Sequence, residues 1–141
     1  MKVDEMSYTY EFPMVSITAT TVVINRDTLE ILLIKRGKDP EKGKYAFPGG
    51  FMNSGKENVV QAAKRELMEE VNLDIDIERF IQVDIRTEPD RDIRGHVCDV
   101  GFYITVSDRE AQKVKAGDDA ESFEWIYFRA LIDWDAMVCH R

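Results

Sequence analysis

The sequence has few of the residues that build a disulfide framework or a metal site of the zinc type. It contains two cysteines, Cys98 and Cys139, and two histidines, His96 and His140. Neither pair has the spacing of a metal-binding motif, and two isolated cysteines do not form a disulfide framework. This usage suits a reducing compartment, so we expect a cytoplasmic protein in which the histidines are bystanders.

Long apolar runs are also missing. No stretch approaches the roughly 20 apolar residues that cross a bilayer, and the N-terminus lacks the order of a signal peptide. We therefore expect no membrane association. A chain of 141 residues can bury one proper core, so we assign residues 1–141 to a single domain.

Basic residues are outnumbered, with 19 Lys and Arg against 27 Asp and Glu and a formal net charge of -8. Binding to a phosphate backbone requires clustered Lys and Arg, so this balance argues against a nucleic-acid partner. A small phosphorylated ligand remains compatible with it, because bound divalent cations and a few placed arginines reverse the local potential.

The clearest local pattern is an amphipathic helix over residues 59–71. Its apolar stripe recurs at helical spacing and comprises Val59, Val60, Ala63, Leu67 and Val71. Asn58 is a good N-cap, because its side-chain oxygen can accept a backbone N–H of the first turn.

Three carboxylates, Glu66, Glu69 and Glu70, follow one another at i, i+3 and i+4 near the end of this helix. They repel one another and oppose the helix dipole, so a helix built only for stability would not place them there. A hard divalent cation such as Mg²⁺ or Mn²⁺ removes the repulsion, since such ions prefer oxygen ligands. A solvated acidic face is the alternative interpretation, and spacing alone favours it.

Strand patterns surround the helix. Stretches rich in β-branched and aromatic residues predict strands over 15–25, 29–35, 80–86, 97–106 and 122–128. The first two are separated by a turn and form a hairpin. Gly101 indicates a bulge, and residues 129–141 are a weaker candidate for a C-terminal helix. The order of strands, helix, strands and helix predicts an α/β fold with a mixed sheet.

The region from Pro48 to Leu73 resembles the signature of the Nudix hydrolases. A Pro-Gly-Gly turn and a polar loop precede a set of matching positions: Glu57, Arg65, Glu66, Leu67, Glu69, Glu70 and Leu73. Two positions depart from the signature. Six residues, not five, separate Gly50 from Glu57, and Asn72 replaces a glycine. Asn tolerates the left-handed conformation needed at a helix C-terminus. The resemblance implies an α/β/α sandwich around a mixed sheet.

Membership of that family implies roles for the matching residues. Glu66, Glu69 and Glu70 would bind Mg²⁺ or Mn²⁺, with a backbone carbonyl of Gly49 or Gly50 completing the metal shell. One of the three glutamates, with Glu69 as the candidate, would also polarise the attacking water. Glu57 and Arg65 would form an ion pair that orients the loop against the helix.

Two further segments resemble Nudix proteins that act on ADP-ribose, and also the sensor domains of regulators of NAD metabolism. They are residues 89–96 and residues 116–120, the latter followed by Trp125. An acidic loop containing Asp118, Asp119 and Glu121 carries the general base in some family members, although a plain acidic turn is the simpler interpretation.

Two arginines and an aromatic residue are candidate substrate contacts. Arg36 and Arg94 can bind phosphate oxygens bidentately, although a solvated surface role is equally open for each. Phe47 or Tyr45 can stack on an adenine ring, although an aromatic residue before a turn more often belongs to the core. Gly49 is expected to contact the substrate through its backbone.

The leading hypothesis is hydrolysis of ADP-ribose to AMP and ribose 5-phosphate. A second hypothesis is hydrolysis of another nucleotide, such as an oxidised nucleoside triphosphate or a dinucleotide. A third is a non-catalytic nucleotide-sensing domain, against which the complete glutamate set argues. Homodimers are frequent in the family, which leaves a homodimeric state open.

Overall fold

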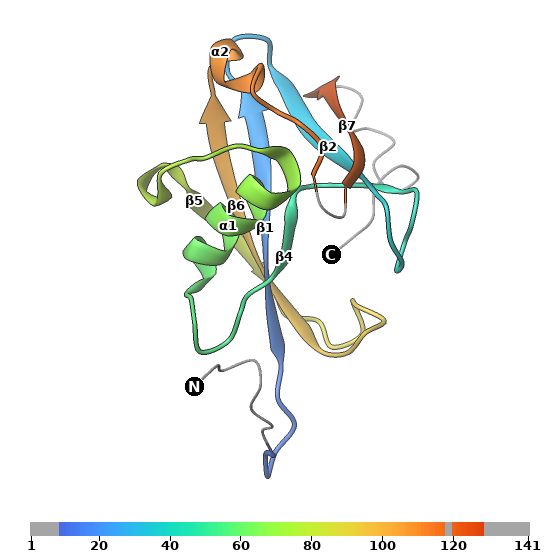
Figure 1. The fold of residues 1–141 in the computed structure, drawn as a ribbon. Helices are drawn as coiled ribbons and strands as arrows, with labels where there is room; N and C mark the ends of the chain where they lie inside the picture. The colour runs from blue at the N-terminus through green and yellow to red at the C-terminus, as the bar shows by residue number, and fades with distance from the viewer. Residues whose placement is uncertain (1–8, 118–119, 129–141) are drawn as a thin grey trace.

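The computed structural model describes residues 9–117 and 120–128 of the chain (Figure 1). Its strands and helices follow in the order β1 (Ser16–Asn25), β2 (Glu30–Arg36), β3 (Tyr45–Ala46), β4 (Gly49–Phe51), α1 (Val59–Val71), η2 (Ile77–Arg79), β5 (Ile81–Arg86), β6 (Val97–Val106), α2 (Asp108–Ala111) and β7 (Ala120–Tyr127). The described part of the chain contains no helix long and apolar enough to cross a membrane.

The strands form a mixed sheet in the order β3-β2-β1-β6-β5, with β4 also paired to β1 and β7 to β2. β1 and β6 run parallel over their full length, whereas β1 is antiparallel to β2 and β4. A parallel pair requires a long crossover between its strands, and here the crossover contains α1. The predicted α/β class with a mixed sheet is therefore confirmed.

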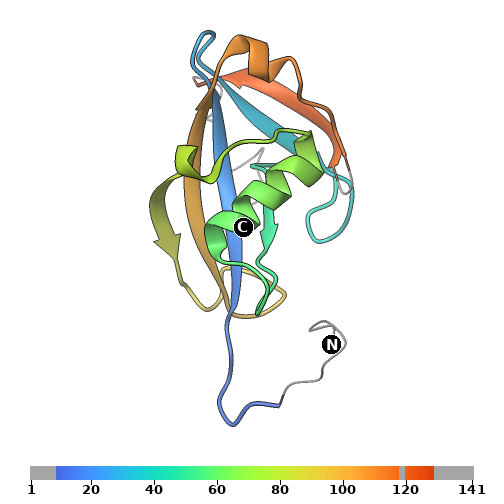
Figure 2. The same ribbon diagram turned by 60° about the vertical axis from the view of Figure 1, so that its left-hand side comes forward.

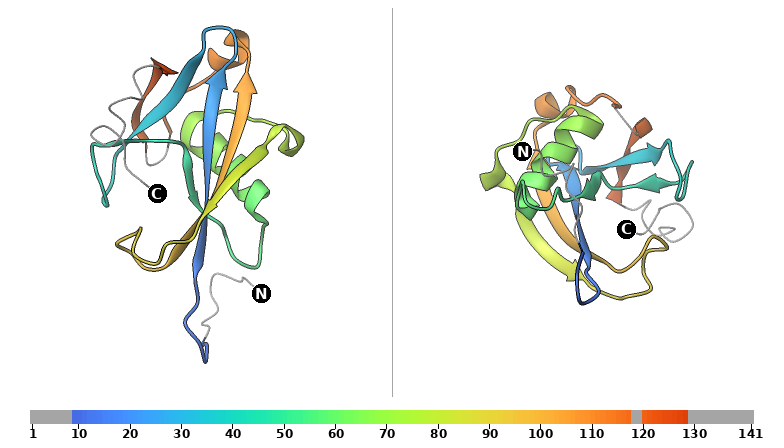
Figure 3. Two further views of the ribbon diagram at one scale, coloured as in Figure 1. Left: turned by 180° about the vertical axis from the view of Figure 1, so that it is seen from behind. Right: turned by 60° about the horizontal axis from the view of Figure 1, so that its bottom comes forward.

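α1 lies across one face of the sheet (Figure 2). Figure 3, seen from behind, shows β1, β6 and β5 in front of the helix. The helix buries Ala62, Ala63, Leu67 and Val71. Leu67 is 1% exposed, so its truncation to Ala would cost about 2–5 kcal/mol. The apolar stripe that the sequence predicted is thus the surface that fixes the helix on the sheet.

Both ends of α1 confirm the expected capping. Asn58 accepts a hydrogen bond from the backbone N–H of Gln61, and the Gln61 side chain accepts one from the N–H of Asn58. Asn72 has a φ of 61° and a ψ of 31°, the left-handed conformation that a helix C-cap requires. Asn72, which replaces the glycine of the Nudix signature, therefore ends the helix in the same conformation that a glycine would adopt.

A buried carboxylate ties the two central strands together. Asp99 on β6 is 2% exposed and accepts hydrogen bonds from the hydroxyls of Thr18 (2.7 Å) and Thr20 (2.8 Å) on β1. Buried carboxylates are tolerated when donors surround them. These hydrogen bonds join β1, with which β4 pairs, to β6, which follows the β5–β6 loop.

The structure differs from the sequence-based expectation at several points, which include the unpredicted strand β3 and 3-10 helix η2. Gly49–Phe51 forms strand β4 and not only a turn, because Gly49 lacks the Cβ that would collide with the backbone oxygen of Ala19. The bulge expected at Gly101 lies opposite it, between Gln82 and Asp84 of β5. The helix α2 was missed, and residues 129–141 lie outside the described residues.

Candidate functional site

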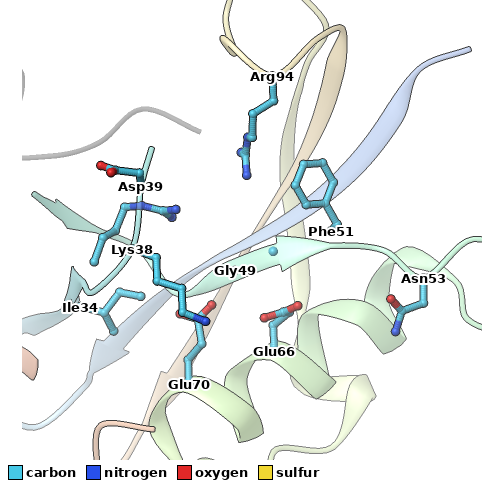
Figure 4. Close-up of a pocket in the computed structure, with 11 residues that line it drawn as sticks. Ile34, Lys38, Asp39, Gly49, Phe51, Asn53, Glu66, Glu70 and Arg94 are labelled. Carbon is cyan, nitrogen blue, oxygen red and sulfur yellow. The ribbon is translucent and has the colours of Figure 1, made fainter. Parts of the chain in front are cut away.

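A cavity of about 340 Å³ lies between the β2–β3 loop, β4, α1 and the β5–β6 loop (Figure 4). Its size is that of a small-molecule pocket. The described residues that line it are Ile34, Arg36, Lys38, Asp39, Gly49, Gly50, Phe51, Asn53, Glu66, Glu70 and Arg94. Residues from four separate parts of the chain therefore meet at one place.

Two carboxylates of α1 project into this cavity. Glu66 and Glu70 lie one helical turn apart and point toward β4. The side chain of Glu66 is 15% exposed, and Glu70 as a residue is 7% exposed. Two like charges in a poorly solvated site are unfavourable unless cations or donors compensate them. The pair therefore forms an acidic wall suited to a cation.

Gly50 makes room for this wall. A Cβ on Gly50 would lie 2.5 Å from Oε1 of Glu66 and 2.6 Å from its Cδ. Real side chains do not tolerate such distances, so any larger residue would displace the Glu66 carboxylate. Because Gly50 has no side chain, the Glu66 carboxylate can lie directly against the backbone of Gly50.

Glu69 does not share this cavity in the described structure. Its side chain is 44% exposed, accepts a hydrogen bond from Nη1 of Arg65 at 3.1 Å, and lies outside the cavity lining. The expectation that all three carboxylates project together is therefore met by Glu66 and Glu70, while Glu69 does not line the cavity. Nη1 of Arg65 donates to both Glu66, at 2.8 Å, and Glu69, at 3.1 Å, and this contact holds Glu69 in its present direction.

Arg65 joins the loop after β4 to the helix. Its Nη2 and Nε donate to Oε1 and Oε2 of Glu57 at 2.7 and 3.0 Å, and Nη2 also donates to the carbonyl oxygen of Phe51 at 2.9 Å. A further bond from Nη1 reaches Glu66 at 2.8 Å. The hydrogen bonds from Arg65 lower the pKa of Glu57, and those to Glu57 raise the pKa of Arg65. Both groups therefore stay charged.

The additional loop residue is absorbed in a turn. The Glu57 carboxylate accepts the backbone N–H of Asn53 at 2.8 Å, and the backbone N–H of Lys56 donates to the Asn53 carbonyl at 3.1 Å. Gly55 adopts a φ of 80°, which favours glycine. The turn closes before the helix starts, so the Glu57–Arg65 pair forms despite the longer loop.

Basic side chains also line the cavity. Arg36 and Lys38 come from β2 and the loop after it, and the Nε of Arg36 donates to the carbonyl oxygen of Pro40 at 2.7 Å. The Lys38 side chain extends toward Glu70, and Arg94 reaches in from the β5–β6 loop (Figure 4). Positive groups and two carboxylates in one cavity suit a ligand that carries both a metal ion and phosphates.

The cavity contains residues that sequence reasoning missed. Phe51, Lys38 and Asn53 line it, whereas Phe47 is half-buried and is not among the lining residues. Phe51 follows the double glycine directly, and strand alternation would have placed it on the face opposite Gly50. That signal was available once the segment was recognised as a strand.

The loop before β7 is attached to the end of α1. The backbone N–H groups of Lys115 and Gly117 donate to the carbonyls of Val71 (3.0 Å) and Glu70 (2.9 Å). A Cβ on Gly117 would lie 2.6 Å from the carbonyl oxygen of Glu69. The loop therefore fixes the helical turn that bears the carboxylates. Asp118 and Asp119 lie outside the described residues.

The acidic wall fits a hard divalent cation. Among the residues that the structure describes, no three His, Cys, Asp or Glu side chains are grouped closely enough to bind one ion. Mg²⁺, however, is commonly held by one or two carboxylates together with waters and substrate phosphates. Glu66 and Glu70 supply such a partial ligand set, and phosphates of a ligand would complete it.

The comparisons with known proteins agree with this architecture. A family model described as the NUDIX domain matches residues 15–138. The ADP-ribose pyrophosphatase of Methanocaldococcus jannaschii is 43% identical over 103 residues, which cover 73% of this chain and 57% of that relative. The chain thus spans less than two thirds of that relative's length.

Solved structures give the same result. A MutT/nudix family protein from Enterococcus faecalis superposes with a TM-score of 0.74 and 31% identity, covering 84% of this chain and 46% of that chain. A bifunctional NMN adenylyltransferase/ADP ribose pyrophosphatase from Francisella tularensis, complexed with AMP and a manganese ion, gives a TM-score of 0.69 and 27% identity, covering 84% and 36%.

The chain belongs to the Nudix family, and its architecture is that of the Nudix α/β/α sandwich with a mixed sheet. The resemblance seen in the signature residues is therefore confirmed at the level of the family and the fold.

Proposed function

We propose that this protein is a metal-dependent Nudix hydrolase that cleaves the diphosphate of a nucleoside diphosphate derivative, with ADP-ribose as the preferred substrate. The observation that carries the proposal is that Glu66, Glu70 and Gly50 line one cavity together with the basic side chains of Arg36 and Lys38. The relative from Methanocaldococcus jannaschii, named as an ADP-ribose pyrophosphatase, supports the choice of substrate.

Glu66 and Glu70 would hold Mg²⁺ or Mn²⁺, with the backbone carbonyl of Gly50 as a further oxygen donor. A bound divalent ion neutralises the diphosphate and makes a water molecule more acidic. The manganese ion in the Francisella tularensis structure supports a divalent cofactor of this kind. The acidic residues of α1 would therefore bind the divalent cation that neutralises the negative charge of the diphosphate.

The reaction consumes one water molecule. Its oxygen forms a bond to one phosphorus atom of the diphosphate, the bridging P–O bond breaks, and the leaving phosphate takes the electron pair. A carboxylate accepts the proton from water. With ADP-ribose, the products are AMP and ribose 5-phosphate, and catalysis consists mainly of positioning and charge stabilisation.

Arg36 and Gly49 position the diphosphate in this proposal. Arg36 lines the cavity, and its Nε is already fixed by the Pro40 carbonyl, so its remaining N–H groups are presented from a fixed position. Glu57 and Arg65 orient the loop and the helix relative to each other through their paired hydrogen bonds. Neither of these two residues needs to touch the reacting phosphorus.

Glu69 keeps its proposed role as metal ligand and as the group that polarises water. To fill that role, its carboxylate must release Nη1 of Arg65, now at 3.1 Å, and turn toward the cavity. Glu69→Gln and Glu70→Gln are then each expected to lower kcat about a hundredfold or more, because each removes a charged ligand. An unchanged kcat in Glu69→Gln alone would remove Glu69 from the catalytic set.

The test of the proposal is AMP formation from ADP-ribose with Mg²⁺, with and without EDTA, followed by chromatography. Wild type is expected to release equal amounts of AMP and ribose 5-phosphate, and EDTA is expected to stop the reaction. An oxidised nucleoside triphosphate and a dinucleotide serve as alternative substrates. A higher kcat/KM for either would move the assignment to that substrate. Binding of ADP-ribose without turnover of any substrate would identify a sensing domain.

A further inference from the structure

An aromatic ring and a guanidinium stack on each other at the wall of the cavity. The Cζ of Arg94 lies 4.6 Å from the centroid of the Phe51 ring, within the range of a cation–π contact. Both side chains line the cavity, on the far side of β4 from Glu66 and Glu70 (Figure 4). Phe51 is 37% exposed. The ring is therefore available at a cavity wall and does not serve only as core.

The orientation of Arg94 is fixed by Asp92. The Nε and Nη2 of Arg94 donate to Oδ1 and Oδ2 of Asp92 at 2.9 and 2.7 Å, and the backbone N–H of Arg94 donates to Oδ1 at 2.9 Å. The side chain of Asp92 is 6% exposed. A bidentate pair of this kind holds the guanidinium plane in one direction. Asp92 thus holds the guanidinium of Arg94 in place, with its Cζ 4.6 Å from the centroid of the ring.

We propose that Phe51 and Arg94 form a base clamp in which the base of the nucleotide substrate stacks on the Phe51 ring, while Arg94, already 4.6 Å from the ring centroid, supports the ring. Phe51 is then a specificity-determining residue, and Asp92 positions Arg94. This rests on the proposed function, because it places the base relative to the diphosphate. A base has two flat π faces and stacks well on aromatic and guanidinium groups, whereas a ribose has none.

The position of the clamp along β4 supports the assignment. Gly50 faces the carboxylates of α1, and Phe51 is the next residue, so its side chain points to the other face of the strand. A nucleotide that crosses β4 can therefore place its diphosphate near Glu66 on one face of the strand and its base against Phe51 on the other face. The clamp also gives Arg94 a different role from the phosphate contact that its charge alone suggested.

Binding of the two reaction products separates the base from the sugar phosphate. AMP carries the base, and ribose 5-phosphate does not, so both are titrated calorimetrically into the full chain with Mg²⁺. Phe51→Leu keeps an apolar side chain and removes the ring. It is expected to weaken AMP binding about ten- to hundredfold and to leave ribose 5-phosphate binding within about twofold. Phe51→Trp is expected to restore AMP binding.

A matched control uses another exposed aromatic residue. Phe12 is 71% exposed and is not among the residues that line the cavity, so Phe12→Leu is expected to leave AMP binding unchanged. Equal AMP affinity in Phe51→Leu and wild type would overturn the clamp. The measurement needs no turnover, so an inert protein that still loses AMP binding in Phe51→Leu would refute the hydrolase and keep the clamp.

Arg94 is tested against a phosphate role. Arg94→Lys keeps the charge and removes the planar group, so it is expected to weaken AMP binding about tenfold and to leave inorganic pyrophosphate binding unchanged. A phosphate ligand would behave otherwise, with Arg94→Met weakening pyrophosphate and Arg94→Lys restoring it. That pattern would overturn the proposed role of Arg94 as the support of the base-binding ring.

Asp92 is tested through Arg94. Asp92→Asn is expected to weaken AMP binding about threefold in wild type and to have no further effect in the Arg94→Lys background, since the two residues act as a unit. Additive losses would show that Asp92 acts independently of Arg94 and would contradict its positioning role.

Discussion

Acidic side chains serve two different purposes at the two ends of the sheet. Near α2, Glu110 accepts hydrogen bonds from Nη1 and Nη2 of Arg79 at 2.7 and 3.0 Å and from the backbone N–H of Ser107 at 3.0 Å. On α1, Glu66 and Glu70 instead extend side by side into a cavity. Glu110 is held by donors of its own chain away from that cavity. Glu66, although it accepts a bond from Arg65 at 2.8 Å, and Glu70 are placed where an external cation can bind.

This contrast distinguishes structural charge from functional charge. The surroundings of Glu110 lower its pKa to about 2, mainly through the hydrogen bonds from Arg79, so its charge contributes to the folded state. At α1, like charges at i and i+4 destabilise the helix by a few tenths of a kcal/mol and are retained at a cavity. Position relative to a cavity, and not acidity as such, therefore makes Glu66 and Glu70 the candidate metal ligands.

The largest expected effect is on activity at α1. Glu66→Gln keeps an acceptor for the Arg65 bond at 2.8 Å but removes one of the two cavity charges. We expect kcat/KM for ADP-ribose to fall about a hundredfold or more, with the free energy of unfolding changed by less than about 1 kcal/mol. Steady-state kinetics and urea unfolding measure the two quantities.

Glu110→Gln is the matched variant at the other end. It is expected to keep kcat/KM within about twofold and to lose about 1–2 kcal/mol of stability, because a charged acceptor of Arg79 is removed. If both variants lost activity and stability to the same extent, the distinction between the two regions would fail.

Gly50→Ala is expected to have the next largest effect. Its Cβ would lie 2.5 Å from Oε1 of Glu66, so the carboxylate must move away from the strand. We expect at least about a tenfold loss of kcat/KM and about 1–3 kcal/mol of destabilisation from overpacking. Gly43→Ala provides a control, because a Cβ there meets nothing within 4 Å, although its φ of 85° adds strain of its own. Full activity in Gly50→Ala would show that Glu66 does not need its place at the strand.

The smallest expected effect is on the pH dependence of stability. Hydrogen bonds from Arg79 lower the pKa of Glu110 in the folded protein to about 2, from an ordinary value of 4.5. Its contribution is therefore fully present above pH about 4.5 and is lost as the pH falls toward 2. Urea unfolding gives the free energy of unfolding of wild type and Glu110→Gln at about seven pH values between roughly 6 and 2.5. The difference between the two proteins is expected to shrink as the pH falls. A constant difference would contradict the assigned pKa.

The sequence predicted most of the fold where one local signal dominated. The bounds of α1 and β6 match the predicted ranges, since a helical stripe between two Asn caps and a long apolar strand leave little ambiguity. Strand β4 was missed because its three residues include two glycines, and its pairing with β1 depends on backbone contact. The capping box from Ser107 to Glu110 was a readable signal for α2 that was overlooked.

The site was predictable as far as the signature extends. Spacing placed Glu66 and Glu70 together, but it could not show that Glu69 turns toward Arg65, because side-chain direction depends on the neighbouring loop. Phe51 and Lys38 come from segments far apart in the chain, and only tertiary structure brings them to the same cavity. Residues joined by long-range packing are the ones that a local pattern does not identify.

The most direct test of the central claim is the binding of Mn²⁺ followed by electron paramagnetic resonance of the free ion. Wild type and Glu110→Gln are expected to remove free Mn²⁺ from solution with the same affinity in the presence of AMP. Glu66→Gln and Glu70→Gln are each expected to weaken that affinity at least about tenfold. Equal Mn²⁺ affinity in all four proteins would contradict the assignment of the α1 carboxylates as the metal site.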